Sequence, residues 1–175
     1  MFRTIAALAL ASASANPSAT LTSTAPWWEK VTVTVTDDGQ TQSCRYESSM
    51  TPNAGKDCSV TGDAASMTHK AGAKDEYTRI TFERRFSPNA QPDLSSLQPG
   101  ETLLGGQVMA LAIDGRGDVK GCKVLQTGGS VTPQYGCTDA AAEHFSASAV
   151  SARARTAEHE GYMTILVYGH SEHVV

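Results

Sequence analysis

Four cysteines are the residues whose type and spacing most clearly predict chemistry. Cys44 and Cys58 lie 58 − 44 = 14 positions apart, and Cys122 and Cys137 lie 137 − 122 = 15 apart. Zinc sites and thioredoxin-like redox sites use much closer ligands, such as Cys-x-x-Cys, and the sequence contains no such motif. Cysteines in an exported chain favour disulfides. Three pairings are possible by arithmetic, and the cysteine count does not choose among them.

An internal repeat favours one pairing. In each half of the chain an alternating run meets an Asp/Gly turn, a second run reaches a cysteine, another cysteine follows, and a strand-like run closes the unit. The offset between the halves is 122 − 44 = 78 at the first cysteine and 137 − 58 = 79 at the second. Repetition on this scale organises a whole fold. We therefore predict the disulfides Cys44–Cys58 and Cys122–Cys137, one within each unit.

Motifs for catalysis or cofactor binding are not found in the sequence. It contains no Gly-x-Ser-x-Gly nucleophile elbow and no Walker loop, and no Gly-x-Gly-x-x-Gly opens a helix after a strand. The paired acids Asp37-Asp38 and Asp75-Glu76 lie in expected turns, where adjacent side chains point apart. We therefore expect no catalytic residue, no cofactor and no enzymatic activity.

Two histidines near the C-terminus are the best candidates for a metal site. His170 and His173 form a His-x-x-His pair beside Glu172. A metal site needs a third ligand held in place, and a short chain terminus is poorly suited to hold one. We therefore predict no metal site.

The N-terminus has the pattern of a secretory signal peptide over residues 1–15. Arg3 supplies the positive charge, Ile5 to Ala11 form a short apolar run, and Ala13-Ser14-Ala15 is a small-residue cleavage site. The apolar run is too short to span a bilayer. We therefore predict that the chain is exported to the periplasm or the medium and has no membrane span.

The charge balance argues against nucleic acid as a partner. The chain has 14 basic and 18 acidic side chains, so loss of Arg3 with the signal peptide changes the net charge from −4 to 13 − 18 = −5. Nucleic-acid binding needs clustered Lys and Arg side chains, and the only basic pairs of this chain are Arg84-Arg85 and Arg153 with Arg155.

Local periodicity predicts strand, strand, helix, strand in each unit. Val and Thr alternate strictly over 31–36, with an Asp-Gly turn before a returning strand at 41–46, and 77–86 is a strand expected at an edge. Residues 108–113 are apolar enough for a strand buried on both faces. Thr138-Asp139 can cap a helix that runs to about Arg155, and a short helix is expected over 64–67.

Composition divides the mature chain into two units. The expected segments are a disordered lead-in at 16–26, a first unit at 27–86, a Pro-rich linker at 87–102 and a second unit at 103–175. The expected fold class is α+β, with two ββαβ units of antiparallel sheet and one disulfide in each.

The second unit resembles the C-terminal domain of TonB-type energy transducers. The resemblance covers about 103–169 and rests on the hairpin from Leu111 to Ser130, with its Asp-Gly-x-Gly turn and cysteine, followed by Cys137 at a helix start. It implies a ββαβ protein-binding unit whose last strand accepts an extended segment, such as the box of an outer-membrane receptor. The chain lacks the membrane anchor and long Pro-rich spacer of a transducer, so we do not expect energy coupling.

Partner binding is thus the function that the sequence favours. The matching strand predicts binding at an exposed edge through Tyr162, Thr164, Leu166 and Tyr168. The expected partner is an outer-membrane receptor or another envelope protein, and an intertwined homodimer is a further possibility. The alternative is a small-molecule-binding protein or enzyme whose pocket forms between the two units.

Overall fold

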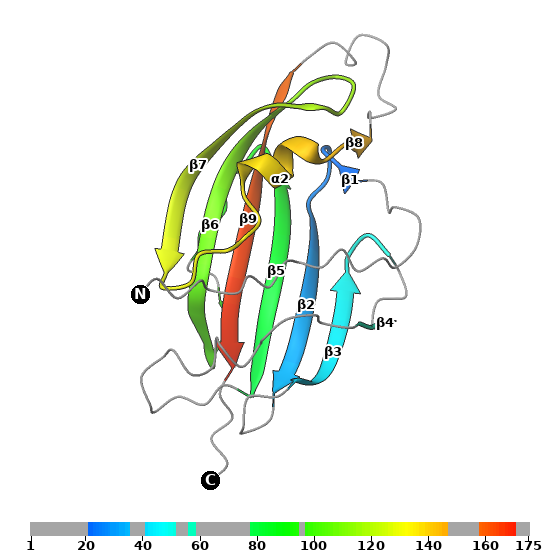
Figure 1. The fold of residues 1–175 in the computed structure, drawn as a ribbon. Helices are drawn as coiled ribbons and strands as arrows, with labels where there is room; N and C mark the ends of the chain where they lie inside the picture. The colour runs from blue at the N-terminus through cyan, green and yellow to red at the C-terminus, as the bar shows by residue number, and fades with distance from the viewer. Residues whose placement is uncertain are drawn as a thin grey trace, which may run out of the picture.

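Strands dominate the chain, and most of them join one antiparallel sheet. The structure is a computed structural model that describes residues 21–35, 41–51, 56–58, 78–94, 97–146 and 158–170. The strands of the large sheet are β2 (Trp27–Val35), β3 (Thr41–Ser48), β4 (Lys56–Asp57), β5 (Arg79–Pro88), β6 (Glu101–Ile113), β7 (Val119–Gly129) and β9 (His159–His170). Their order is β4-β3-β2-β5-β9-β6-β7, as Figure 1 shows. The short strands β1 (Leu21–Thr22) and β8 (Phe145–Ser146) pair in parallel beside it.

The predicted α+β class with two ββαβ units is wrong. The described residues are mainly β-sheet, and their single helix, α2 (Cys137–Ala142), is six residues long. The helix expected to reach about Arg155 ends at Ala142, and Phe145 enters β8 instead. The backbone N–H of Phe145 donates to the carbonyl of Gly117 at 2.8 Å, and its ring is fully buried. Tertiary pairing and burial therefore override the helix propensity of the Ala-rich sequence. The short helix expected at 64–67 lies outside the described residues.

The two halves nevertheless have the same strand arrangement. In the first half β2 lies between β3 and β5, and in the second half β6 lies between β7 and β9. Val33 pairs with Cys44 and Leu111 with Cys122, so each first cysteine follows its strand partner by the same interval, 44 − 33 = 11 and 122 − 111 = 11. The halves join where β5 pairs antiparallel with β9. Equivalent strands thus meet at the centre of one continuous sheet.

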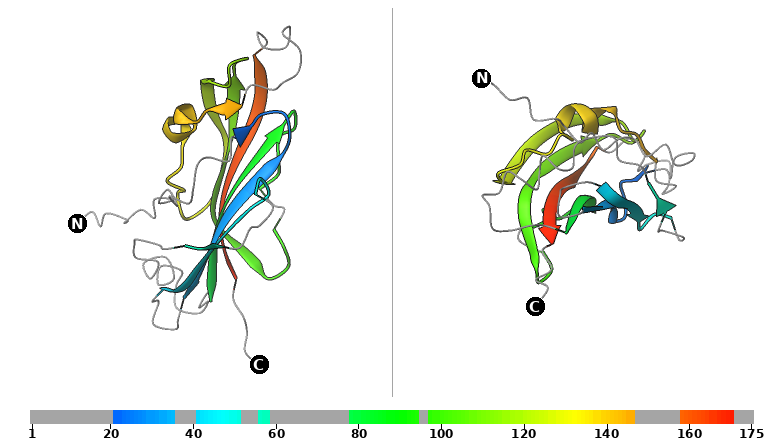
Figure 2. Two further views of the ribbon diagram at one scale, coloured as in Figure 1. Left: turned by 90° about the vertical axis from the view of Figure 1, so that its right-hand side faces the viewer. Right: turned by 60° about the horizontal axis from the view of Figure 1, so that its bottom comes forward.

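The central strands are buried because both faces of the sheet are covered. Successive side chains of a strand point to opposite faces, so β9 contributes to two cores. Met163 and Ile165 pack with Ala140 of α2 on what we call the helix face, whereas Leu166 and Tyr168 pack with Leu94 on the opposite face. Figure 2, left, shows α2 standing on one side of the sheet. The prediction that residues 108–113 form a strand buried on both faces is confirmed by β6, whose four large apolar side chains in that span are at most 1% exposed.

The Pro-rich linker packs against the sheet. Leu94, in the middle of the linker, is 4% exposed and contacts Val108, Leu166 and Tyr168. We call the described residues 89–94 and 97–100 the strap, and the face beneath them the strap face.

β5, expected at an edge because neither of its faces is cleanly apolar, lies instead between β2 and β9. Its polar Glu83 is accepted in the interior because the hydroxyl of Tyr168 and the guanidinium of Arg85 both donate to it.

Gly117 fixes the β6–β7 hairpin against β8, and an alanine there should be costly. Its φ of +93° lies in the left-handed region, and a Cβ would fall 1.7 Å from the carbonyl oxygen of Phe145. We expect Gly117→Ala to lower the free energy of unfolding by about 2–4 kcal/mol, measured by urea denaturation. Gly121→Ala is the matched control, because its Cβ would only make ordinary contact with Ala112 at 3.5 Å. Equal stability of the two variants would contradict this account of the turn.

Candidate functional site

The four residues predicted to bind a partner lie in the middle of the sheet. Tyr162, Thr164, Leu166 and Tyr168 belong to β9, which pairs with β5 on one side and with β6 on the other. Both backbone edges of β9 are therefore occupied, so no strand can be added at these residues. Thr164 and Leu166 are also only 1% exposed. The predicted exposed edge at β9 is wrong, because treating each unit separately overlooks the pairing between the two units.

The long free edge of the sheet is β7. This eleven-residue strand ends the sheet, and no described strand pairs with its outer side. Most of its residues are exposed, including the large apolar side chains Val124 and Leu125 at 42% and 39%. Val108 pairs with Gln126 and Met109 with Val124, so Leu125 is an extra residue with no partner in β6. Such a bulge twists the strand and directs its extra side chain away from regular pairing.

The equivalent strand of the first half, β3, is covered at its middle. The short strand β4 pairs with Arg45 and Tyr46 of β3. The Cys44–Cys58 disulfide holds the end of β4 there, and the Cys58 N–H donates to the Cys44 carbonyl at 3.2 Å. The first disulfide thus joins a covering segment to the edge of the sheet.

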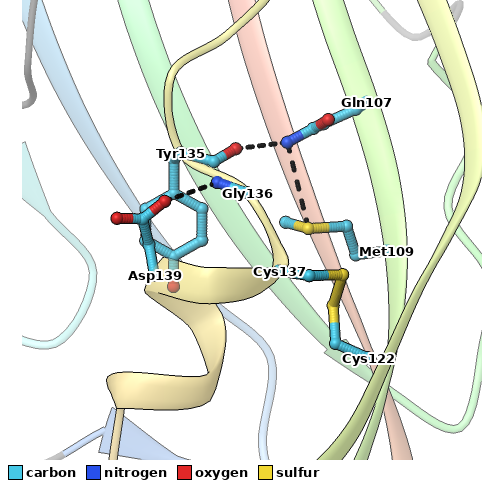
Figure 3. Close-up of a disulfide and its surroundings, with 7 residues drawn as sticks. All are labelled: Gln107, Met109, Cys122, Tyr135, Gly136, Cys137 and Asp139. Atoms are coloured by element: carbon cyan, nitrogen blue, oxygen red, sulfur yellow. Dashed lines mark hydrogen bonds between the residues drawn. A yellow bond between two sulfur atoms is a disulfide. The ribbon is translucent and has the colours of Figure 1, made fainter.

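The second disulfide has a different effect on its edge. Cys137 begins α2, and its bond to Cys122 fixes the helix over the helix face, where Ala140 reaches the core. The Gly136 N–H donates to the Asp139 carboxylate at 2.8 Å, which closes the first turn, and the Gln107 amide donates to the Tyr135 carbonyl (Figure 3). Both predicted disulfides are confirmed, and they indicate an oxidising, extracytoplasmic compartment. Only the Cys44–Cys58 disulfide holds a strand, β4, against the edge strand of its half.

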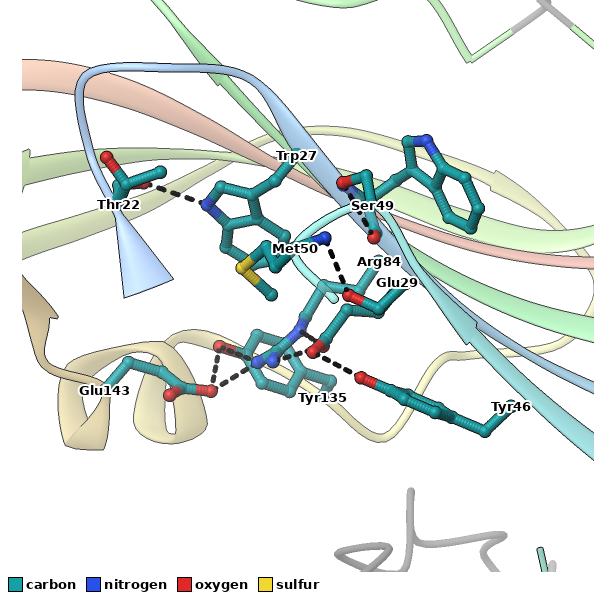
Figure 4. A network of polar contacts seen from close by, with 11 residues as sticks. Thr22, Trp27, Glu29, Tyr46, Ser49, Met50, Arg84, Tyr135 and Glu143 are labelled. Carbon is teal, nitrogen blue, oxygen red and sulfur yellow. Dashed lines mark hydrogen bonds and ion pairs between the residues drawn. The ribbon is translucent and has the colours of Figure 1, made fainter. Parts of the chain in front are cut away.

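A charged network lies on the helix face, centred on Arg84 of β5. Arg84 donates to the carboxylate of Glu29 at 2.6 and 3.1 Å and forms a second ion pair with Glu143 just after α2. Its guanidinium also lies over the rings of Trp27 and Tyr135, with centroids 5.2 and 5.3 Å away (Figure 4). These contacts join β2, β5 and the end of α2.

The charges of this network are satisfied internally. The Tyr46 hydroxyl donates to Glu29 at 2.9 Å, and the Tyr135 hydroxyl donates to Glu143 at 3.2 Å. Burial disfavours the charge of Arg84, but Glu29 and Glu143 outweigh it and raise the pKa of the guanidinium. Burial and, to a smaller extent, the negative charge of Glu143 raise the pKa of the Tyr135 hydroxyl well above its usual range. Both groups are thus held in their ordinary protonation states, which suits a structural role.

The described residues include neither a cluster of metal-ligating side chains nor a membrane-spanning helix. Among them, no group of three or more His, Cys, Asp and Glu side chains is placed to hold a metal ion. His170 ends β9, and His173 lies outside the part of the chain that the structure describes. Within that part, no helix is long and apolar enough to cross a membrane.

Sequence reasoning missed Val124 and Leu125, the exposed apolar residues of β7. Two adjacent apolar residues in an otherwise polar stretch, Lys120 to Thr127, were the available signal. The polar residues around them indicate a strand buried on at most one face, and neighbouring side chains of a strand point to opposite faces, so at least one of the two should be exposed. Only the strand order, however, identifies β7 as an edge.

Comparison with known proteins finds no matching family model, no matching curated protein and no matching solved structure. The resemblance to the TonB C-terminal domain therefore stays a prediction from the residues.

Proposed function

We propose that this protein is a periplasmic or secreted protein-interaction module that binds an extended segment of a partner at the outer edge of β7. The observation that carries the proposal is that β7 is long, exposed and unpaired on its outer side among the described residues, whereas its equivalent β3 is covered by β4. An open strand edge offers unpaired N–H and C=O groups that an extended peptide can satisfy.

The side chains of β7 suit such a partner. Main-chain hydrogen bonds would supply affinity, and apolar side chains of the added segment would cover Val124 and Leu125. The paired central strands and two disulfides would hold the edge in place, so little conformational entropy would be lost on binding. This keeps the strand-addition mechanism that the TonB resemblance implies and moves it from β9 to β7.

Selection of short random peptides by the mature chain, residues 16–175, tests the proposal. The affinity of a selected peptide is measured by calorimetry, and amide hydrogen exchange is followed with and without it. We expect slower exchange within 119–129, because an added strand protects the outward-facing amides of β7. Protection centred on any other element would contradict the proposal, as would failure to select a binder.

A pair of charge variants locates the binding edge. Val124→Lys with Leu125→Lys should weaken binding on the order of tenfold or more, because charged lysines replace the apolar contact and blunt the edge. Gln42→Lys with Ser43→Lys is the matched control, since it adds the same charge to exposed residues of β3. Both double variants change exposed positions and should keep the wild-type stability to within about 0.5 kcal/mol. Equal loss of affinity in the two variants would argue against β7.

The alternative prediction placed a small-molecule pocket or an active site between the two units. The described halves meet through ten residue pairs of the β5–β9 ladder, through the Arg84–Glu143 ion pair and in the core of the helix face. No contact in this junction favours that alternative over binding at β7.

A further inference from the structure

The charges of β7 are all of one sign. Its ionisable side chains outside the disulfide are Lys120 and Lys123, and the strand has no acidic residue, although the whole chain has a net charge of −4. Lys120 is partly neutralised by Asp114 and Asp118 of the hairpin turn, at 3.4 and 3.6 Å. Lys123 is exposed and forms no ion pair within the described part of the chain. The edge therefore presents one unpaired positive charge beside its apolar pair.

Lys123 lies where it would meet an added strand. It is opposite Ala110 of β6, and the side chain of Ala110 carries no charge. A strand added on the outer side of β7 would place one residue directly across from Lys123, with Cβ atoms about 5 Å apart. At that separation an opposite charge attracts and a like charge repels. The residue in that position would thus determine part of the affinity.

The same lysines disfavour a second copy of this chain as the partner. Pairing of β7 with its own copy would bring four lysines and no acidic residue from the two strands into one interface. Lysines on edge strands commonly prevent this kind of self-association. A partner with carboxylates has the complementary charge.

We propose that the segment bound at β7 is acidic, with a Glu or Asp side chain opposite Lys123 and apolar side chains over Val124 and Leu125. This inference rests on the proposed function, because it specifies the partner of that same edge.

The test uses two synthetic versions of one selected peptide. They are identical except at the position that crosslinking or paramagnetic labelling places opposite Lys123, which is Glu in one and Lys in the other. The wild-type chain should bind the Glu peptide on the order of tenfold more tightly, since one version gains an attraction and the other a repulsion. Lys123→Glu should reverse this preference, and added salt should reduce it.

Arg45→Glu is the matched control, because it makes the same charge change at an exposed position of β3. It should leave the preference of the wild-type chain unchanged. Equal affinity for the two peptides, with exchange protection still at β7, would overturn the acidic partner but leave the proposed function standing. Loss of that protection with both peptides would overturn both. Sedimentation of the free chain as a dimer that Val124→Lys with Leu125→Lys dissociates would assign the edge to a second copy instead.

Discussion

Replacing Arg84 with methionine should lower the free energy of unfolding by about 2–3 kcal/mol. The change leaves the carboxylates of Glu29 and Glu143 without their shared cation, at positions where their side chains are only 19% and 27% exposed. Breaking a fully buried ion pair in this way costs about 3–5 kcal/mol, and the partial exposure of these carboxylates reduces that cost. Loss of the cation–π contacts with Trp27 and Tyr135 adds to the effect. Urea denaturation at neutral pH measures it.

Lys30→Met is the control for this prediction. Lys30 of β2 pairs with the single carboxylate of Glu47 at 3.2 Å, where the two side chains are 32% and 26% exposed. Glu47 keeps Arg45 at 3.7 Å and contact with water when Lys30 is lost, so the expected cost is at most about 1 kcal/mol. Glu29→Gln should restore part of the stability in the Arg84→Met background, because it removes one uncompensated charge. If Arg84→Met costs no more than Lys30→Met, the network does not stabilise the helix face as argued.

Local patterns predicted local structure well. The Val/Thr alternation at 31–36 and the Asp-Gly step predicted the β2–β3 hairpin, since period-two patterning and turn chemistry are properties of neighbouring residues. The spacing of the cysteines, together with the internal repeat, predicted both disulfides. These features depend on residues close in sequence or on comparison of the two halves.

Features that depend on distant contacts were not predictable in the same way. Polar side chains on both faces, Glu83 among them, made β5 look like an edge, because Tyr168, the partner of Glu83, is 85 residues away. The Ala-rich stretch after Cys137 favoured a long helix, but pairing of Phe145 with Gly117 ends it early. The prediction of a free edge at β9 was wrong for the same reason. Packing between the two units decides which of their strands pair with each other. The hydrophobic periodicity within one unit carries no information about that pairing.

Removing the Cys122–Cys137 disulfide should cost about 3 kcal/mol, the chain-entropy estimate for a loop of 15 residues. The change to test is the double variant Cys122→Ala with Cys137→Ala, compared by urea denaturation with the wild-type chain under oxidising conditions. The same double change at Cys44 and Cys58 opens a loop of 14 residues, so its entropic cost should be nearly equal. Any difference between the two variants then reports on the folded state.

We expect the Cys122–Cys137 variant to lose more stability than the Cys44–Cys58 variant. Cys122 and Cys137 pack against the core beneath α2, and a helix of six residues is too short to persist without its tertiary contacts. Faster amide exchange at 137–142 in this variant, with exchange in β9 unchanged, would show that the disulfide holds α2 on the sheet. Equal losses in the two variants, with α2 still protected, would mean that burial of Ala140 alone keeps the helix in place and that this disulfide acts only on the unfolded chain.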